Sequence, residues 1–257
     1  MRLRQIALIA HEIAPVAASL ETVFGLRSAF RDKAVEIFGL ANAVMPCGGE
    51  FIEVLEPMRA GTSGGRYLDR KGGDAGYMVI LQDQESLDHR ARLAAAGVRI
   101  IAASEPARYR FTHFHPADCA GVLLSIDSVV GEDWREPFCD WPAAGPDWRA
   151  YQSAISRGVR SVDVQARDPK VAADRFAGLL ERPVTPAPNQ DGAWELNLAS
   201  GLIRFVPPVD ADGTGVVGVE IAVDDPAAAL ARARAAGLPV EADAVRICGV
   251  AMRPVPV

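Results

Sequence analysis

The chain of 257 residues has an ordinary globular composition, with 49% hydrophobic and 23% charged residues. Its formal net charge is -6 and it has no run of lysine and arginine, which argues against nucleic-acid and membrane partners, because both need a basic surface. We therefore expect a small-molecule substrate or ligand. The four cysteines are scattered without a CxxC pair, a pattern that favours a reducing, cytoplasmic setting.

The first quarter of the chain has the pattern of a βαβββ unit, module one. An apolar strand over Gln5–Ile9 passes into a helical pattern that ends at Gly25, which is typical of a helix C-cap. Residues 34–38, 41–45 and 50–55 are then predicted to form three short strands separated by glycines.

The same order of elements restarts three times, giving modules two, three and four. Their first strands are predicted at 77–81, 161–166 and 218–223. Each following helix ends near a glycine, namely Gly97, Gly178 or Gly237. From strand start to glycine each of the four modules spans between 17 and 20 residues, which indicates an internal repeat. The sequence therefore predicts an α+β fold of four βαβββ modules paired into two domains.

A stretch rich in Trp, Pro, Asp and Gly lies between modules two and three and is typical of an interdomain linker. We predict domain one at 1–130, the linker at 131–157, and domain two at 158–257 with a degenerate, truncated last module. Three tryptophans spaced by seven residues lie in this stretch: Trp134, Trp141 and Trp148. We expect them to pack the linker onto a domain rather than to stack on a ligand.

Three motifs in the N-terminal half carry a family resemblance. They are the strand and helix that end in Phe24-Gly25-Leu26, the strand Phe-Ile-Glu-Val-Leu-Glu-Pro at 51–57, and Phe-His-Pro-Ala-Asp-Cys-Ala-Gly-Val-Leu-Leu at 114–124. They resemble the vicinal oxygen chelate superfamily (glyoxalase, bleomycin-resistance and dioxygenase-like proteins), most closely the methylmalonyl-CoA epimerases and glyoxalase I enzymes. The resemblance implies glyoxalase-like domains with curved, mostly antiparallel sheets around a cleft that holds a divalent metal.

The resemblance also implies which positions would hold that metal. The first-strand and last-strand ligand positions fall on Gln5 and Glu53 in module one, and on Tyr77 and Ser125 in module two. Tyrosine and serine hydroxyls bind divalent ions weakly, so at most a weakly held divalent metal on Gln5 and Glu53 is expected, and no other cofactor. In modules three and four the corresponding positions are Ser161, Arg204 and Gly218, which cannot form such a site.

Glu53 and Tyr77 are the candidate catalytic residues. A carboxylate on the inner face of a cleft can act as a general base if burial raises its pKa, whereas on the other face of the strand Glu53 would only be a solvated side chain. Tyr77 can donate a hydrogen bond to a carbonyl or an enolate. Its alternative role is that of a core aromatic residue with a satisfied hydroxyl.

The candidate substrate-binding residues are Gln5, Ser125, His113, His115 and Arg66. The two histidines alternate with Phe111 on one side of a predicted strand and could form a proton-transfer or ligand pair. His115 could instead only close the strand. Arg66 belongs to the glycine-rich segment 59–67, which could approach a phosphate or carboxylate, or be a flexible connector.

Two functions follow from these residues, and we favour the enzyme. In a lyase or isomerase of glyoxalase or epimerase type, Glu53 removes a proton next to a carbonyl while Gln5 and Tyr77 stabilise the oxyanion. In the alternative, the cleft binds or sequesters a small molecule without chemistry. An extradiol dioxygenase ranks third, because no His, His, Glu iron site maps onto the sequence. The oligomeric state stays open, with a homodimer as one option.

Overall fold

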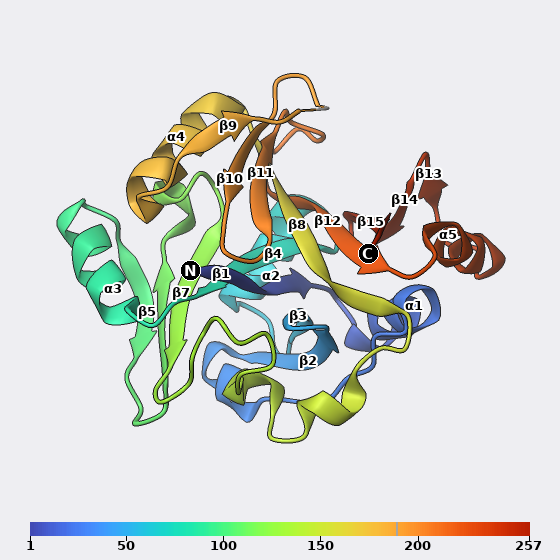
Figure 1. The fold of residues 1–257 in the computed structure, drawn as a ribbon, viewed down its shortest axis with the longest axis horizontal. Coiled ribbons are helices and arrows are strands. Elements are labelled where there is room, and N and C mark those ends of the chain that lie inside the picture. Colours follow the sequence, from blue (N-terminus) through green and yellow to red (C-terminus); the bar gives the residue numbers. More distant parts are fainter. Residues whose placement is uncertain (189) are drawn as a thin grey trace. The chain divides into compact units, whose positions relative to one another are not determined.

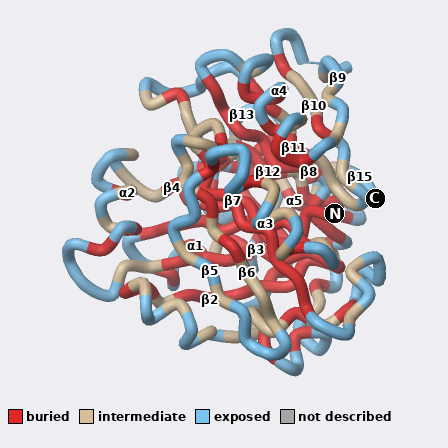
Figure 2. Tube along the Cα trace, turned by 90° about the vertical axis from the view of Figure 1, so that its left-hand side faces the viewer, coloured by how far each residue is buried: buried red, intermediate tan, exposed pale blue. Residues whose placement is uncertain are grey.

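The computed structural model describes residues 1–188 and 190–257. Within these residues the strands form a seven-stranded sheet of order β2-β3-β1-β4-β7-β6-β5 and an eight-stranded sheet of order β13-β14-β15-β12-β8-β11-β10-β9 (Figure 1). The buried residues follow the strands (Figure 2). The predicted α+β architecture of four repeated modules is confirmed.

Module one contains β1 (Arg2–Ile9), α1 (Ile13–Phe24), the 3-10 helix η1 (Lys33–Phe38), β2 (Leu40–Cys47) and β3 (Glu50–Pro57). Helix α1 buries apolar residues at a spacing of three or four and ends at Gly25, whose φ of 66° confirms the predicted cap. The strand predicted at 34–38 is wrong. Those residues form η1, because Asp32 accepts a hydrogen bond from the Ala34 N–H and Gly39 ends the helix at φ 71°.

The segment that joins modules one and two is helical, which corrects the flexible connector considered for residues 59–67. Helix α2 spans Ser63–Lys71. Its N-cap is Thr62, whose hydroxyl accepts a hydrogen bond from the Gly65 N–H at 3.0 Å. Gly64 is buried on this helix, where an added Cβ would lie 2.6 Å from a side-chain carbon of Ile9. The glycine therefore permits close packing of the helix.

Module two contains β4 (Ala75–Gln82), α3 (Ser86–Ala95), β5 (Ile100–Ser104), β6 (Tyr109–Phe114), the 3-10 helix η2 (Pro116–Asp118) and β7 (Leu123–Val129). Strand β7 runs parallel to β4 and antiparallel to β6. Gly97 lies just beyond α3 with a φ of 81°, close to the predicted helix end.

Between modules two and three the structure places two short 3-10 helices, η3 (Pro142–Ala144) and η4 (Trp148–Tyr151). The earlier part of the segment is held by two buried arginines of β1. Arg4 donates to the carbonyls of Pro137 and Cys139 at 2.9 and 2.8 Å, and Arg2 donates to the Glu136 carbonyl at 3.2 Å. Charged N–H groups therefore satisfy backbone carbonyls that have no strand partner.

Module three contains β8 (Ser156–Ala166), α4 (Pro169–Leu180), β9 (Val184–Pro186), β10 (Trp194–Asn197) and β11 (Leu202–Val206). The helix begins at Asp168, whose carboxylate accepts a hydrogen bond from the Val171 N–H at 3.0 Å. The predicted helix end at Gly178 is wrong. The glycine lies inside α4, and Glu181 is the left-handed cap at φ 54°.

Module four contains β12 (Thr214–Val223), α5 (Pro226–Ala235), β13 (Val240–Glu241), β14 (Ala244–Ile247) and β15 (Val250–Pro256). It has one strand, a helix and three further strands, so the expectation of a truncated module is wrong. Two of its strands are too short to give a strong alternation in the sequence.

Contacts along the chain group it into two compact units. The first unit comprises residues 1–4, 77–140 and 161–217, and the second comprises residues 5–76, 141–160 and 218–257. Modules two and three therefore belong to the first unit and modules one and four to the second. The boundaries at 130 and 158 stay a prediction. All four cysteines are buried and free, and no helix in the described residues is long and apolar enough to span a bilayer.

Candidate functional site

In every module the last strand pairs parallel with the first strand, and this pairing aligns the candidate positions. We call a pair of directly opposite residues on these two strands a rung. In each module one rung contains the last-strand position that the family resemblance assigns to a metal ligand. The four rungs are Ala7–Glu53, Ile80–Ser125, Asp163–Arg204 and Glu220–Arg253. The same backbone geometry therefore presents a carboxylate, a hydroxyl and two guanidinium groups in the four modules.

In module one the structure brings Gln5 and Glu53 together with Asn42. All three side chains are at most 5% exposed. The Gln5 amide donates to Glu53 Oε2 at 2.8 Å and the Asn42 amide donates to Oε1 at 2.6 Å. Glu53 is therefore buried rather than solvated, with each carboxylate oxygen bonded to an amide N–H.

Two groups that can only donate fix the orientation of these amides. The Trp141 indole Nε1 donates to Gln5 Oε1 at 2.7 Å, and the Asp32 backbone N–H donates to Asn42 Oδ1 at 2.8 Å. If either amide were flipped, its NH2 group would face another donor and its oxygen would face the carboxylate. Both amides must therefore present their NH2 groups to Glu53.

Aromatic rings of the segment between modules two and three pack beside this network. Trp141 and Trp148 are fully buried and both contact Phe51 of β3. Trp141 is stacked with Phe51 at a centroid distance of 6.3 Å, and Trp148 meets the same ring edge-on at 4.9 Å. The prediction that the tryptophans pack the linker is confirmed for these two, whereas Trp134 is only half-buried.

Burial raises the pKa of the Glu53 carboxyl above its usual range. The hydrogen bonds from Asn42 and Gln5 oppose the rise because they stabilise the charged form, and the nearby Asp32 charge adds to it. A raised pKa is what a general base requires. A proton taken from a substrate would, however, have to bind a Glu53 oxygen, and each of these oxygens already accepts a hydrogen bond from an amide.

The donor set around Glu53 does not fit the divalent metal that the fold family implies. A metal needs lone pairs, but the two amides present N–H groups to the carboxylate, and Gln5 Oε1 already accepts from Trp141. Among residues 1–188 and 190–257 no three His, Cys, Asp or Glu side chains are grouped as a metal site. We therefore derive no chemical step through a metal.

In module two Ser125 belongs to a different buried cluster. Its hydroxyl bonds to the Asp127 carboxylate and lies 3.1 Å from the Thr112 carbonyl oxygen, so one proton serves two acceptors. The Tyr109 hydroxyl donates to the other Asp127 oxygen at 2.5 Å. Ser125 and Asp127 are at most 1% exposed, and binding of a ligand by Ser125 stays a prediction.

Tyr77 lies one residue away from the position equivalent to Gln5. Gln5 precedes the Ala7–Glu53 rung by two residues, and the residue two before the Ile80–Ser125 rung is Met78. Side chains alternate along a strand, so Tyr77 shares a face with Val79 and Leu81, opposite the face of Ser125. The structure therefore does not place Tyr77 with the inner-face residues of its own module.

The structure places the two histidines in different elements. His115 lies beyond the end of β6, where its Nδ1 accepts a hydrogen bond from the Ala117 N–H and caps η2. His113 lies on β6 beside Phe111, with ring centroids 4.7 Å apart. Burial lowers the pKa of His113 to about 4. The imidazole is therefore neutral near neutral pH.

Arg66 lies on α2 and is exposed. Its guanidinium donates to the Gly61 carbonyl at 2.6 Å, so it closes the turn that precedes its own helix. Binding of an anion by Arg66 stays a prediction.

Asn42, Trp141 and Asp127 were not among the candidate site residues. Asn42 was predictable, because the turn at Gly48 and Gly49 sets Val44 opposite Glu53 and so puts Asn42 on the same face. Trp141 was not, since its partner Gln5 is 136 residues away.

Module three fills the corresponding rung with an enclosed ion pair. Arg204 donates to Asp163 at 2.8 Å and to Glu195 at 2.9 Å, and all three side chains are at most 13% exposed. The carboxylates of Asp163 and Glu195 are therefore both bonded to the Arg204 guanidinium, which has no lone pair for a metal.

The repeated modules define a glyoxalase-like α+β fold, as the sequence predicted. A hypothetical protein from Staphylococcus aureus matches the whole fold: its structure aligns with 100% of this chain and 99% of its own, with a TM-score of 0.68 and 11% identity. No protein-family model matches the sequence, and no curated protein does.

Solved structures of methylmalonyl-CoA epimerases match half of the chain. A Streptomyces coelicolor epimerase variant in complex with 2-nitronate-propionyl-CoA covers 51% of this chain and 96% of its own, with a TM-score of 0.46 and 21% identity. The Mycobacterium tuberculosis epimerase covers 50% of this chain and 88% of its own, with a TM-score of 0.45 and 17% identity.

Replacing Trp141 by phenylalanine tests the role of its indole N–H. The change keeps an aromatic ring but leaves the buried Gln5 oxygen without its donor, which should lower the free energy of unfolding by about 1–3 kcal/mol. Urea denaturation measures this loss. Trp134→Phe, at a half-buried position, is the matched control and should cost less than about 1 kcal/mol. Equal losses in the two variants would contradict the proposed anchoring.

The raised pKa of Glu53 predicts a pH dependence of stability. The folded protein holds the Glu53 proton more tightly than the unfolded chain, so this contribution is complete below the unfolded pKa of about 4.3 and is lost as the pH rises through the folded value. The free energy of unfolding of the wild type relative to Glu53→Gln should therefore fall as the pH rises above about 4. Parallel curves for the two proteins between pH 4 and 8 would show that burial does not raise this pKa.

Proposed function

We propose that this protein is a member of the vicinal oxygen chelate superfamily that binds a small, largely apolar molecule without metal chelation. The observation that carries the proposal is a row of rings on β6. Tyr109, Phe111 and His113 alternate along the strand and none is fully buried. Their neighbouring centroids lie 6.2 and 4.7 Å apart. Such a row offers a continuous aromatic surface to a ligand.

The surroundings of this row favour an uncharged or aromatic ligand. Ala102 and Ser125 pair with His113 on the neighbouring strands, so small side chains flank the rings. His113 is neutral near neutral pH, and a neutral imidazole carries one N–H donor and one acceptor nitrogen. Apolar contact with Phe111 would supply most of the affinity.

A lyase or isomerase in which Glu53 removes a proton is the second candidate. The raised pKa of Glu53 supports it. Its carboxylate is 5% exposed and bonded to two amides, so a substrate could reach it only after Trp141 and Gln5 had moved. Binding without chemistry requires no such rearrangement and is the function that the geometry favours. The extradiol dioxygenase alternative has no support in residues 1–188 and 190–257, where no three His, Cys, Asp or Glu side chains are grouped as an iron site.

Replacing Phe111 by alanine tests the proposed binding face. With 2-naphthol as a neutral aromatic probe, calorimetry should show saturable binding to the wild type and binding at least about tenfold weaker to Phe111→Ala, because the ring contributes both area and stacking. Val171→Ala on α4 removes an exposed apolar side chain elsewhere in the same unit and is the matched control. Its affinity should equal that of the wild type. Equal affinity in Phe111→Ala, or no saturable binding, would overturn the proposal.

A further inference from the structure

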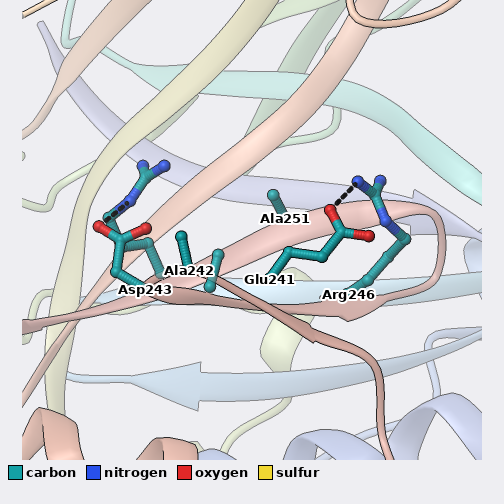
Figure 3. A pocket seen from close by; sticks show the side chains of 7 residues that line it. Glu241, Ala242, Asp243, Arg246 and Ala251 are labelled. Atoms are coloured by element: carbon teal, nitrogen blue, oxygen red, sulfur yellow. Dashed lines mark hydrogen bonds and ion pairs between the residues drawn. The ribbon is translucent and has the colours of Figure 1, made fainter.

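Module four carries a hollow that the proposed function does not use. It has a volume of about 260 Å³ and lies between the β13–β14 hairpin and β15 (Figure 3). Alanines 242, 244 and 251 line it, so the space exists because small side chains occupy these positions. Water occupies about 30 Å³ in the liquid, so the hollow can hold a ligand of roughly eight non-hydrogen atoms.

Two ion pairs flank the alanines on opposite sides of this hollow (Figure 3). On one side Arg253 donates to Asp243 at 2.9 Å, and on the other Arg246 donates to Glu241 at 3.1 Å. Each side of the hollow therefore presents one cationic and one anionic group to a ligand.

The arginines are better anchored than their hairpin carboxylates. Arg246 also donates to the Gly249 carbonyl at 3.2 Å, and Arg253 lies 3.5 Å from Glu220 of β12. The side chains of Glu241 and Asp243 are 70% and 67% exposed, against 43% and 30% for Arg246 and Arg253. Exposed ion pairs contribute little free energy, so a ligand can replace either carboxylate at small cost.

The equivalent rung of module three shows what distinguishes module four. Arg204 is enclosed by Asp163 and Glu195 and only 12% exposed, which leaves it no open side for a ligand. Arg253 occupies the same rung but opens into the hollow.

The charge balance selects the class of ligand. Two arginines face three carboxylates, Glu220, Glu241 and Asp243, so a bare anion would add to an excess of negative charge and a bare cation would leave the guanidinium groups unused. A molecule with one carboxylate and one ammonium group matches both. We propose that the hollow of module four binds a small zwitterion of amino-acid size, with its carboxylate on Arg246 or Arg253 and its ammonium group on Glu241 or Asp243.

Linear amino acids of increasing length test this site on the full chain. Calorimetry with glycine, 4-aminobutyrate and 6-aminohexanoate should find saturable binding for at least one of them. That compound should bind at least tenfold more tightly than the monocarboxylate and the monoamine of the same length. Failure of all three zwitterions to bind, or equal affinity for the monocarboxylate, would overturn the proposal.

Two variants separate this site from the rest of the surface. Arg246→Gln and Arg253→Gln should each weaken binding of the zwitterion at least tenfold. Arg246 is the more exposed of the two, so its variant keeps the test valid if loss of Arg253 disturbs folding. Arg234→Gln, an exposed arginine of α5, makes the same charge change outside the hollow and should bind like the wild type. Unchanged affinity in Arg246→Gln would contradict the assignment.

Discussion

The core of module one depends on a line of hydrogen bonds centred on Glu53. Each end of the line is an N–H group that can only donate. The Trp141 indole donates to the Gln5 amide and the Asp32 backbone N–H donates to the Asn42 amide. Each amide in turn donates to one oxygen of Glu53, so the four hydrogen bonds permit a single arrangement. A buried carboxylate is costly unless it is bonded, and here both its oxygens are. The network explains why the position that the sequence resemblance assigned to a metal ligand can serve as part of a core instead.

The four modules show how one backbone arrangement supports different chemistry. A parallel first and last strand recurs in each, and the equivalent rung ends in Glu53, Ser125, Arg204 or Arg253. Three of these side chains are enclosed by bonded neighbours, whereas Arg253 faces a hollow. The same fold can therefore support different sites, because function depends on the side chains at each site and not on the architecture.

Sequence reasoning recovered the architecture because strands, helices and their terminal glycines repeat locally. Two local signals were ambiguous. Residues 34–38 are rich in Val, Ile and Phe, as strands are, yet the Asp32 cap makes them helical, and Gly178 is tolerated inside α4. Gln5 and Glu53 lie within hydrogen-bonding distance of each other. By strand pairing the residue of module two equivalent to Gln5 is Met78, one residue from Tyr77, and a shift of one residue reverses the sheet face. The contact between Trp141 and Gln5 is tertiary and leaves no local pattern.

The Glu53 network is a closed hydrogen-bonded core and not a metal site. Measuring the metal content of the protein tests this most directly. After incubation with Zn²⁺, Co²⁺ and Mn²⁺ followed by dialysis, elemental mass spectrometry should find far less than one ion per chain, and the same amount in the wild type and in Glu53→Gln. One equivalent of metal retained by the wild type and lost in Glu53→Gln would contradict the account.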